Sequence, residues 1–169
     1  MSKLDLPTIP QRVGSNYPEP FAAPMGARIR QCLGDAGGLT QFGVNLLQLA
    51  PGAWSSQRHW HTEADELVYV LAGEVTLVTD EGPELLRAGE AAGFKGADAN
   101  GHCLRNLSDS DALVLEIGSR IIPTWICSRP RREAPYTSTR TGRRMRTCKG
   151  GRRRGEPKRA FLIFFCPCV

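Results

Sequence analysis

The sequence has no long apolar run, and this excludes a membrane-spanning helix. Hydrophobic residues make up 41% of the 169 residues but occur in short runs, whereas a helix needs roughly 20 consecutive apolar residues to cross a bilayer. The first ten residues also contain no apolar stretch typical of a secretory signal. A cytoplasmic protein is therefore expected.

Helical periodicity is absent as well, and the residues that are present favour β structure. The 18 glycines and 12 prolines separate short runs rich in Val, Leu and Thr, a pattern typical of turn-rich β proteins. The five prolines within residues 1–26 predict an extended arm. Eight or nine strands joined by turns describe a sandwich or a barrel. We expect these strands at residues 27–33, 41–50, 55–61, 66–71, 74–79, 84–87, 90–94, 101–106 and 112–118.

Charge divides the chain into two parts. Residues 1–120 contain 9 Lys and Arg against 15 Asp and Glu, a net charge of −6, whereas residues 121–169 contain 13 against 2, a net charge of +11. The segment 129–159 has little apolar content, so we expect this basic tail to be disordered. Binding of nucleic acid or of a membrane surface is not favoured, because only Tyr136 is interspersed among the arginines.

A second hypothesis for residues 121–169 is that they have no selected role. Their runs of Arg, Pro, Gly and Cys are what GC-rich coding DNA yields when it is read out of frame. The tail would then be a frameshift product.

Histidine is scarce, and all three histidines fit a single metal site. His59 and His61 share one face if they lie on a strand, Glu66 follows after a turn, and His102 comes from a third strand behind Gly101. Three imidazoles and one carboxylate suit one divalent ion such as Fe, Mn, Ni or Zn, with positions left for water or substrate. A pair of histidines on a strand is often a surface accident, but the use of every histidine together with Glu66 favours the metal site.

These residues resemble the two sequence motifs of the cupins, and specifically bacterial single-domain cupins. The first motif is matched by Gly52, His59, His61, Glu66 and Gly73, and the second by Gly89, Gly96, His102 and Asn106. The resemblance covers about residues 10–120. It implies an all-β jelly-roll barrel, or double-stranded β-helix, at residues 27–120, between the extended arm and an irregular tail.

Two departures from the cupin pattern are visible. The proline usual in the turn of the second motif is missing, since Lys95 follows Phe94. Under the shorter spacing of the first motif, Asp65 would replace Glu66 as the carboxylate, although Glu66 is the usual residue type. Neither departure removes a ligand.

The resemblance implies a metalloenzyme that acts on a small organic molecule, as a dioxygenase, an isomerase or a decarboxylase. Alternation along the strands predicts that Arg58 and Arg105 point outward, which leaves Lys95 as the cation near the barrel mouth. An oxygenase is therefore favoured over a sugar-phosphate isomerase, because a phosphate calls for Arg or Lys donors. The predicted substrate pocket contains Gln57, Val68, Leu104, Asn106 and Lys95.

A non-catalytic cupin that binds or senses a small ligand is the alternative, because one fold supports many activities. The resemblance also implies a homodimer. The sequence by itself identifies neither the substrate nor the metal.

Overall fold

Strands form almost all the regular structure of residues 3–120, 124–127 and 160–163, the part of the chain that the computed structural model describes. The other regular elements are two 3-10 helices, η1 (Leu6–Thr8) and η2 (Ala23–Met25), and one short α-helix, α1 (Leu33–Ala36). Within the described residues no helix has the length and apolar character needed to cross a membrane. The strands are β1 (Gln11–Val13), β2 (Arg28–Cys32), β3 (Phe42–Leu49), β4 (His59–His61), β5 (Glu66–Ala72), β6 (Glu74–Val78), β7 (Pro83–Arg87), β8 (Ala91–Phe94), β9 (Cys103–Arg105), β10 (Ala112–Ser119), β11 (Thr124–Cys127) and β12 (Ala160–Ile163).

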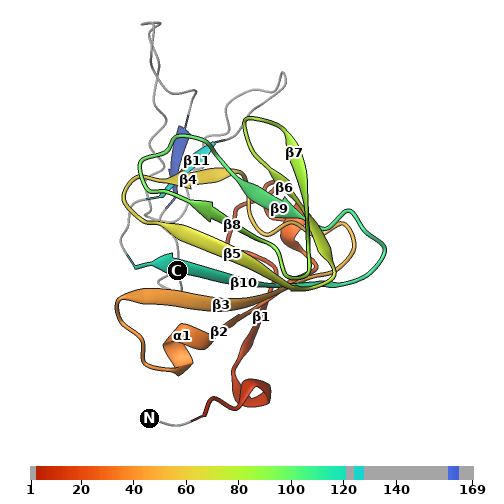
Figure 1. Cartoon of the computed structure of the whole chain (residues 1–169), viewed down its shortest axis with the longest axis vertical. Coiled ribbons are helices and arrows are strands. Elements are labelled where there is room, and N and C mark those ends of the chain that lie inside the picture. Colours follow the sequence, from red (N-terminus) through yellow and green to blue (C-terminus); the bar gives the residue numbers. More distant parts are fainter. Residues whose placement is uncertain (1–2, 121–123, 128–159, 164–169) are drawn as a thin grey trace, which may run out of the picture.

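The strands pair antiparallel and form three sheets, and this confirms the predicted all-β jelly-roll architecture (Figure 1). The largest sheet has six strands in the order β1-β2-β3-β10-β5-β8. Opposite it lie two three-stranded sheets, β7-β6-β9 and β12-β11-β4. Non-consecutive neighbours such as β3 and β10 bring distant parts of the sequence together, which is how the barrel collects residues for one site.

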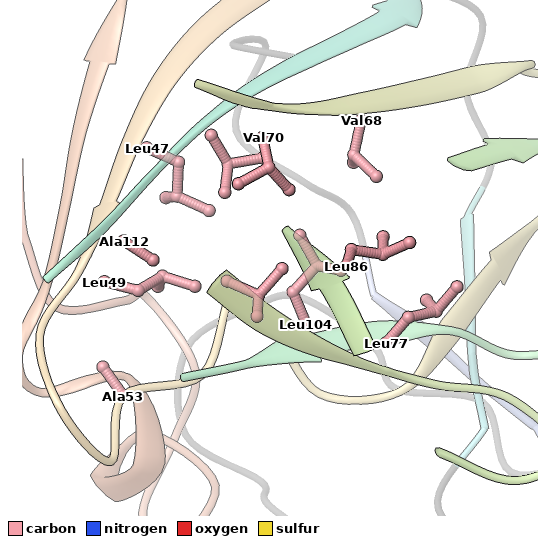
Figure 2. Close-up of a cluster of buried hydrophobic side chains, with 11 residues drawn as sticks. Leu47, Leu49, Ala53, Val68, Val70, Leu77, Leu86, Leu104 and Ala112 are labelled. Atoms are coloured by element: carbon pink, nitrogen blue, oxygen red, sulfur yellow. The ribbon is translucent and has the colours of Figure 1, made fainter. Parts of the chain in front are cut away.

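The hydrophobic core lies between the layers and follows from the alternation along β3 and β10. In both strands every second residue is buried, and the register places Val114 opposite Leu47. Val70 on β5 pairs with Val114 from the other side. Figure 2 shows Leu47 and Val70 directed toward Leu77, Leu86 and Leu104 of the facing sheet. Each Leu or Val buried in this way contributes roughly 1.5–3 kcal/mol.

The strands predicted from the sequence correspond to β2 through β10, with two differences. The strand predicted over residues 55–61 is shorter, because β4 contains only His59–His61. Ser55 instead fixes the preceding loop, since its Oγ accepts a hydrogen bond from the Leu104 N–H at 2.9 Å. The second difference is α1, which occupies part of a segment whose glycines predict a turn.

Both terminal segments contribute described structure to the barrel. In the N-terminal arm, β1 pairs with β2, and the buried Tyr17 and Met25 pack with Trp54. In the tail, β11 pairs with β4, and β12 pairs with β11. The tail was expected to be irregular, but these two short segments are apolar and so can join a sheet edge. The disorder predicted for residues 129–159 lies outside the described residues, and the structure does not address the frameshift hypothesis.

Candidate metal centre

Three elements of the barrel bring the four predicted ligands together. His59 and His61 lie on one face of β4, where both are buried and Trp60 between them is partly exposed. His102 stands just before β9 and is held to β4 by two backbone hydrogen bonds, from His59 N–H to its carbonyl oxygen at 3.1 Å and in the reverse direction at 2.8 Å. Glu66 is the first residue of β5. The four therefore meet because β4 is bridged to the His102 segment and the chain turns back into β5.

The ligand atoms have the spacing that one ion requires. One atom from each of His59, His61, Glu66 and His102 lies within 4.8 Å of all the others. Glu66 Oε2 is 2.8 Å from His61 Nε2, 3.2 Å from His102 Nε2 and 3.8 Å from His59 Nε2. Ligands bound about 2.1 Å from one metal are separated by about 3 Å when adjacent and about 4.2 Å when opposite. The donor set thus fits a divalent ion with small adjustments.

The surroundings of His59 leave its Nε2 atom available as a ligand. Its Nδ1 lies 3.0 Å from the Gln57 carbonyl oxygen and 3.2 Å from the Ser56 hydroxyl. Because a carbonyl oxygen can only accept, Nδ1 carries the proton in that contact. Nε2 then has its lone pair directed into the cluster, as in metal-bound histidines whose second nitrogen donates to the protein.

His102 is buried and is oriented by an aromatic ring. The Phe94 ring stacks on its imidazole with centroids 3.6 Å apart and an interplanar angle of 4°. Burial is the main reason that the pKa of His102 is lowered to about 4. Its imidazole is therefore neutral at neutral pH, which is the form that binds a metal.

Glu66 is held in its ionised form by the imidazoles around it. Burial by itself raises the pKa of this carboxyl group. The contacts of its Oε2 atom with His102 and His61 outweigh that effect, so the pKa of Glu66 lies well below its ordinary value. An anionic carboxylate beside a neutral His102 is the protonation state that a divalent cation stabilises.

The choice between Asp65 and Glu66 is decided by their contacts. Asp65 is exposed and lies outside the cluster, where its Oδ1 accepts a hydrogen bond from the Gly96 N–H at 2.8 Å. Its backbone N–H donates to Ser119 Oγ at 3.1 Å. Gly96 must lack a side chain here, because a Cβ would lie 2.7 Å from the backbone of Glu63. Asp65 thus ties the loop before Glu66 to two neighbouring segments.

The predicted pocket residues occupy three different environments. Val68 and Leu104 are each 2% exposed and belong to the hydrophobic core. Lys95 is exposed, in the loop after β8.

The two amide side chains among the predicted pocket residues donate hydrogen bonds to backbone carbonyl oxygens. Gln57 Nε2 donates to the Phe21 carbonyl oxygen at 2.8 Å. Asn106 is fully buried, and its Nδ2 donates to the carbonyl oxygens of Leu49 and Ser110, both at 2.7 Å. Substrate contact by any of the five residues stays a prediction.

Charged residues also lie on the inner face of the six-stranded sheet, and the sequence did not predict them there. Arg28 and Arg30 pair in register with Leu49 and Leu47 of the core, and both arginines are buried. Glu116 on β10 is buried too, and its Oε2 lies 2.8 Å from Arg30 Nη2. The alternation of Arg28 and Arg30 around Ile29 predicts the opposite orientation. The sequence feature that indicates these buried charges is Glu116, a single acid whose position in the alternation places it on the same face as the buried apolar residues of β10.

Comparison with known proteins finds similarity to one superfamily. The family model of the cupin domain matches residues 45–118. A structure from Silicibacter pomeroyi DSS-3, described as a sugar phosphate isomerase from a cupin superfamily, is 47% identical, with a TM-score of 0.71. The match covers 73% of this chain and 79% of that chain. A protein of Acidithiobacillus ferrooxidans is 33% identical, with a TM-score of 0.56 and coverage of 60% of this chain and 64% of that one.

A third structure shows the fold alone. The polyketide cyclase RemF of Streptomyces resistomycificus is 20% identical, with a TM-score of 0.56, over 70% of this chain and 79% of that chain. No curated protein matches the sequence.

Proposed function

Because this chain belongs to the cupin superfamily, we propose that it is a divalent-metal-dependent enzyme acting on a small organic molecule inside its barrel. The observation that carries this proposal is the convergence of three imidazole nitrogens and one carboxylate oxygen within 4.8 Å. His59, His61, Glu66 and His102 would hold the ion. A bound divalent ion would supply Lewis acidity toward an oxygen atom of the substrate.

The protein's own residues prepare this centre for a ligand. The Gln57 carbonyl fixes the orientation of His59, and the Phe94 ring fixes that of His102. Burial of the cluster keeps bulk water away and strengthens its electrostatic interactions. Four protein ligands leave one or two positions of a five- or six-coordinate ion for the substrate.

Isomerisation is the reaction class to test first. The 47% identical structure is described as a sugar phosphate isomerase. The sequence favoured an oxygenase because Arg58 and Arg105 were predicted to point outward, which left Lys95 as the cation near the mouth. The buried Arg28 and Arg30 are cations that this reasoning did not include. Oxygenation and decarboxylation are the other classes that the resemblance implies.

A non-catalytic ligand-binding cupin is the second candidate, and one observation favours it. Among the described residues classed as buried, Glu116 is the only acid, and it is paired with Arg30. Glu66 would itself be a metal ligand. The cluster therefore contains no free carboxylate to act as a general base.

Turnover measurements separate the two candidates. We expect protein loaded with Fe²⁺, Mn²⁺, Ni²⁺ or Zn²⁺ to convert at least one member of a panel of sugar phosphates, followed by NMR, or of catechols, thiols and diketones, followed by oxygen consumption. His61→Ala should abolish the conversion, whereas Trp60→Phe, on the opposite face of the same strand, should retain it. Tight binding without turnover would support the non-catalytic candidate, and turnover by His61→Ala would contradict the proposed site.

A further inference from the structure

A row of polar and charged side chains crosses the inner face of the six-stranded sheet beside the metal cluster. It consists of Arg30 on β2, Asn45 on β3 and Glu116 on β10, which are 9%, 1% and 6% exposed. The neighbouring residues on the same face of β3 and β10 are apolar core residues such as Leu47 and Val114. Burying charged groups and an amide in such a core is costly unless they have partners, so the row needs an explanation.

The partners within the protein are incomplete. Arg30 Nη2 lies 2.8 Å from Glu116 Oε2, which neutralises the pair. Arg30 Nε and Asn45 Nδ2 are buried donors and Glu116 Oε2 is a buried acceptor, yet among the described residues none of these three atoms has a partner with hydrogen-bond geometry. Buried donors are normally satisfied, and leaving one unpaired costs about 1–3 kcal/mol. Two such donors on neighbouring strands indicate that a group from outside the protein satisfies them.

The strand register places this row next to the metal cluster. Gly118 is the partner of Glu66 in the pairing of β10 with β5, and Glu116 is the partner of Val68. Glu66 and Glu116 are therefore diagonal neighbours on the same face, about 7–8 Å apart and within reach of long side chains. Asn45 is the partner of Glu116 on the other side. The metal cluster and the unpaired donors thus occupy adjoining positions.

The charge beside the cluster is positive. Arg28 lies on the same face as Arg30 but binds only backbone, since its guanidinium donates to the carbonyl oxygens of Gly14 and Ser55. Burial, followed by the nearby Arg30, lowers the pKa of Arg28 to about 10, so it is protonated at neutral pH. Two buried arginines thus face the buried acid Glu116, and a divalent ion would more than balance the ionised Glu66. A ligand with a negative charge would be attracted to this face.

We infer that Arg30 and Asn45 form the oxyanion-recognition part of the proposed metal site, and that its ligand is a small organic acid. One oxygen of that ligand binds at the metal, and its carboxylate or phosphate group accepts hydrogen bonds from Arg30 Nε and Asn45 Nδ2. Glu116 holds the Arg30 guanidinium in place as a positioning residue. This inference rests on the proposed function and names the substrate class of the same site.

The test is calorimetric titration of the full-length, Mn²⁺-loaded protein with three probes. Malonate and inorganic phosphate are the two oxyanions, and malonamide is a neutral analogue of malonate. We expect at least one oxyanion to bind and malonamide not to bind. Malonate alone would assign a carboxylate ligand, and phosphate alone a phosphorylated one. Binding of neither oxyanion, or equal binding of malonamide, would overturn the inference.

Variants show whether the named residues are responsible. Arg30→Lys keeps the charge that balances Glu116 but loses Nε and the planar fork, and Asn45→Leu removes the amide at similar size. Each should weaken oxyanion binding at least about tenfold, as expected for a lost hydrogen bond to a charged group. Arg87→Lys is the matched control, because the Arg87 side chain is 64% exposed on β7, and it should bind like the parent. Unchanged affinity in both inner-face variants would overturn the inference.

Metal content, measured on the same samples, separates this inference from the proposed function. We expect all variants to hold as much Mn²⁺ as the parent, because none changes a metal ligand. If the parent holds no metal, the proposed function fails. Oxyanion binding that still depends on Arg30 and Asn45 would then support the inference on its own.

Discussion

The side chains of the metal cluster are oriented by different contacts with residues outside the cluster. His59 is oriented through the Gln57 carbonyl, His102 through the Phe94 ring, and Glu66 through the strand that it begins. His59, His102 and Glu66 are therefore fixed by contacts that do not involve a metal. A cluster arranged in this way loses little conformational entropy when it binds an ion.

Removing one imidazole should release the metal without unfolding the barrel. His61→Ala and His102→Ala are each expected to lower the metal content from about one ion per chain to near zero, because a three-ligand remnant binds far more weakly. Elemental analysis measures the content, and far-UV circular dichroism confirms the fold. Trp60→Phe is the control. Full metal content in both histidine variants would show that the ion binds elsewhere.

Acid should destabilise the metal-free protein through His102. An imidazole in the unfolded chain titrates near pH 6.5, whereas the folded His102 has a pKa of about 4. Between these values the unfolded state binds more protons, so the free energy of unfolding falls as the pH falls, by on the order of 3 kcal/mol. The lowered pKa of Glu66 acts in the same direction at lower pH.

Urea unfolding of metal-free protein at pH 7, 6 and 5 measures this effect. His102→Gln cannot titrate, so its stability should depend less steeply on pH than that of the parent. Parallel pH profiles for parent and variant would contradict the assignment to His102.

For single residues, the sequence predicts the side-chain orientation where it depends on residues close by in the chain. The two-residue spacing of His59 and His61 predicted a shared face, and the structure shows it. The sequence pattern did not predict that Arg28 and Arg30 point inward, because hydrophobicity alone places Ile29 on the inner face of β2. The burial of Arg30 depends on Glu116, on a strand more than 80 residues further along the chain. That of Arg28 depends on the backbone carbonyl oxygens of Gly14 and Ser55. No local pattern encodes such a pairing.

Among the elements, β4 carries two of the ligands and is paired on two sides. One side is bridged to His102, and the other pairs with β11, where Ile126 is opposite His59. Deleting residues 121–169 removes the second partner only. We expect the truncated chain to keep its metal and to lose about 1–2 kcal/mol of stability, as a few backbone hydrogen bonds are lost.

Metal content and thermal unfolding of the truncated chain check this expectation. A metal content near zero would show that β11 is needed to hold the histidines in place.

The turn between β5 and β6 requires glycine for two reasons. Gly73 has φ of +71°, and a Cβ there would lie 2.6 Å from the Asp111 carbonyl oxygen. Gly52 has a similar φ of +80° but open space around it. Gly52→Ala should therefore cost about 1 kcal/mol from backbone strain alone, and Gly73→Ala at least about 2 kcal/mol more because backbone must move. Urea unfolding compares the two, and equal losses would contradict the contact.

The elements predicted best are those bounded by turn residues. Strands β2 through β10 correspond to apolar or alternating runs between Gly, Pro, Asp and Asn, so local chemistry determines them. The strand expected over 55–61 was too long, because Ser55 bonds the neighbouring Leu104 backbone rather than continuing the ladder of β4. That bond is a tertiary contact, which the sequence pattern does not contain.

In the whole molecule, the barrel topology converts distant sequence positions into one site. The ligands come from β4, β5 and the segment before β9, and the pairing of β10 with both β3 and β5 aligns Asn45 and Glu116 beside them. Spacing and strand alternation predicted the four ligands and their shared site, and the resemblance to cupins supplied the barrel that brings them together. The proposed class of ligand rests on the strand register, which only the folded chain provides.

Anomalous-scattering crystallography of the metal-loaded protein, with data at the absorption edge of the bound ion, tests the central claim most directly. The account predicts one peak about 2.0–2.2 Å from the Nε2 atoms of His59, His61 and His102 and from a carboxylate oxygen of Glu66. A peak bound to other residues, or no peak in the presence of excess metal, would contradict it.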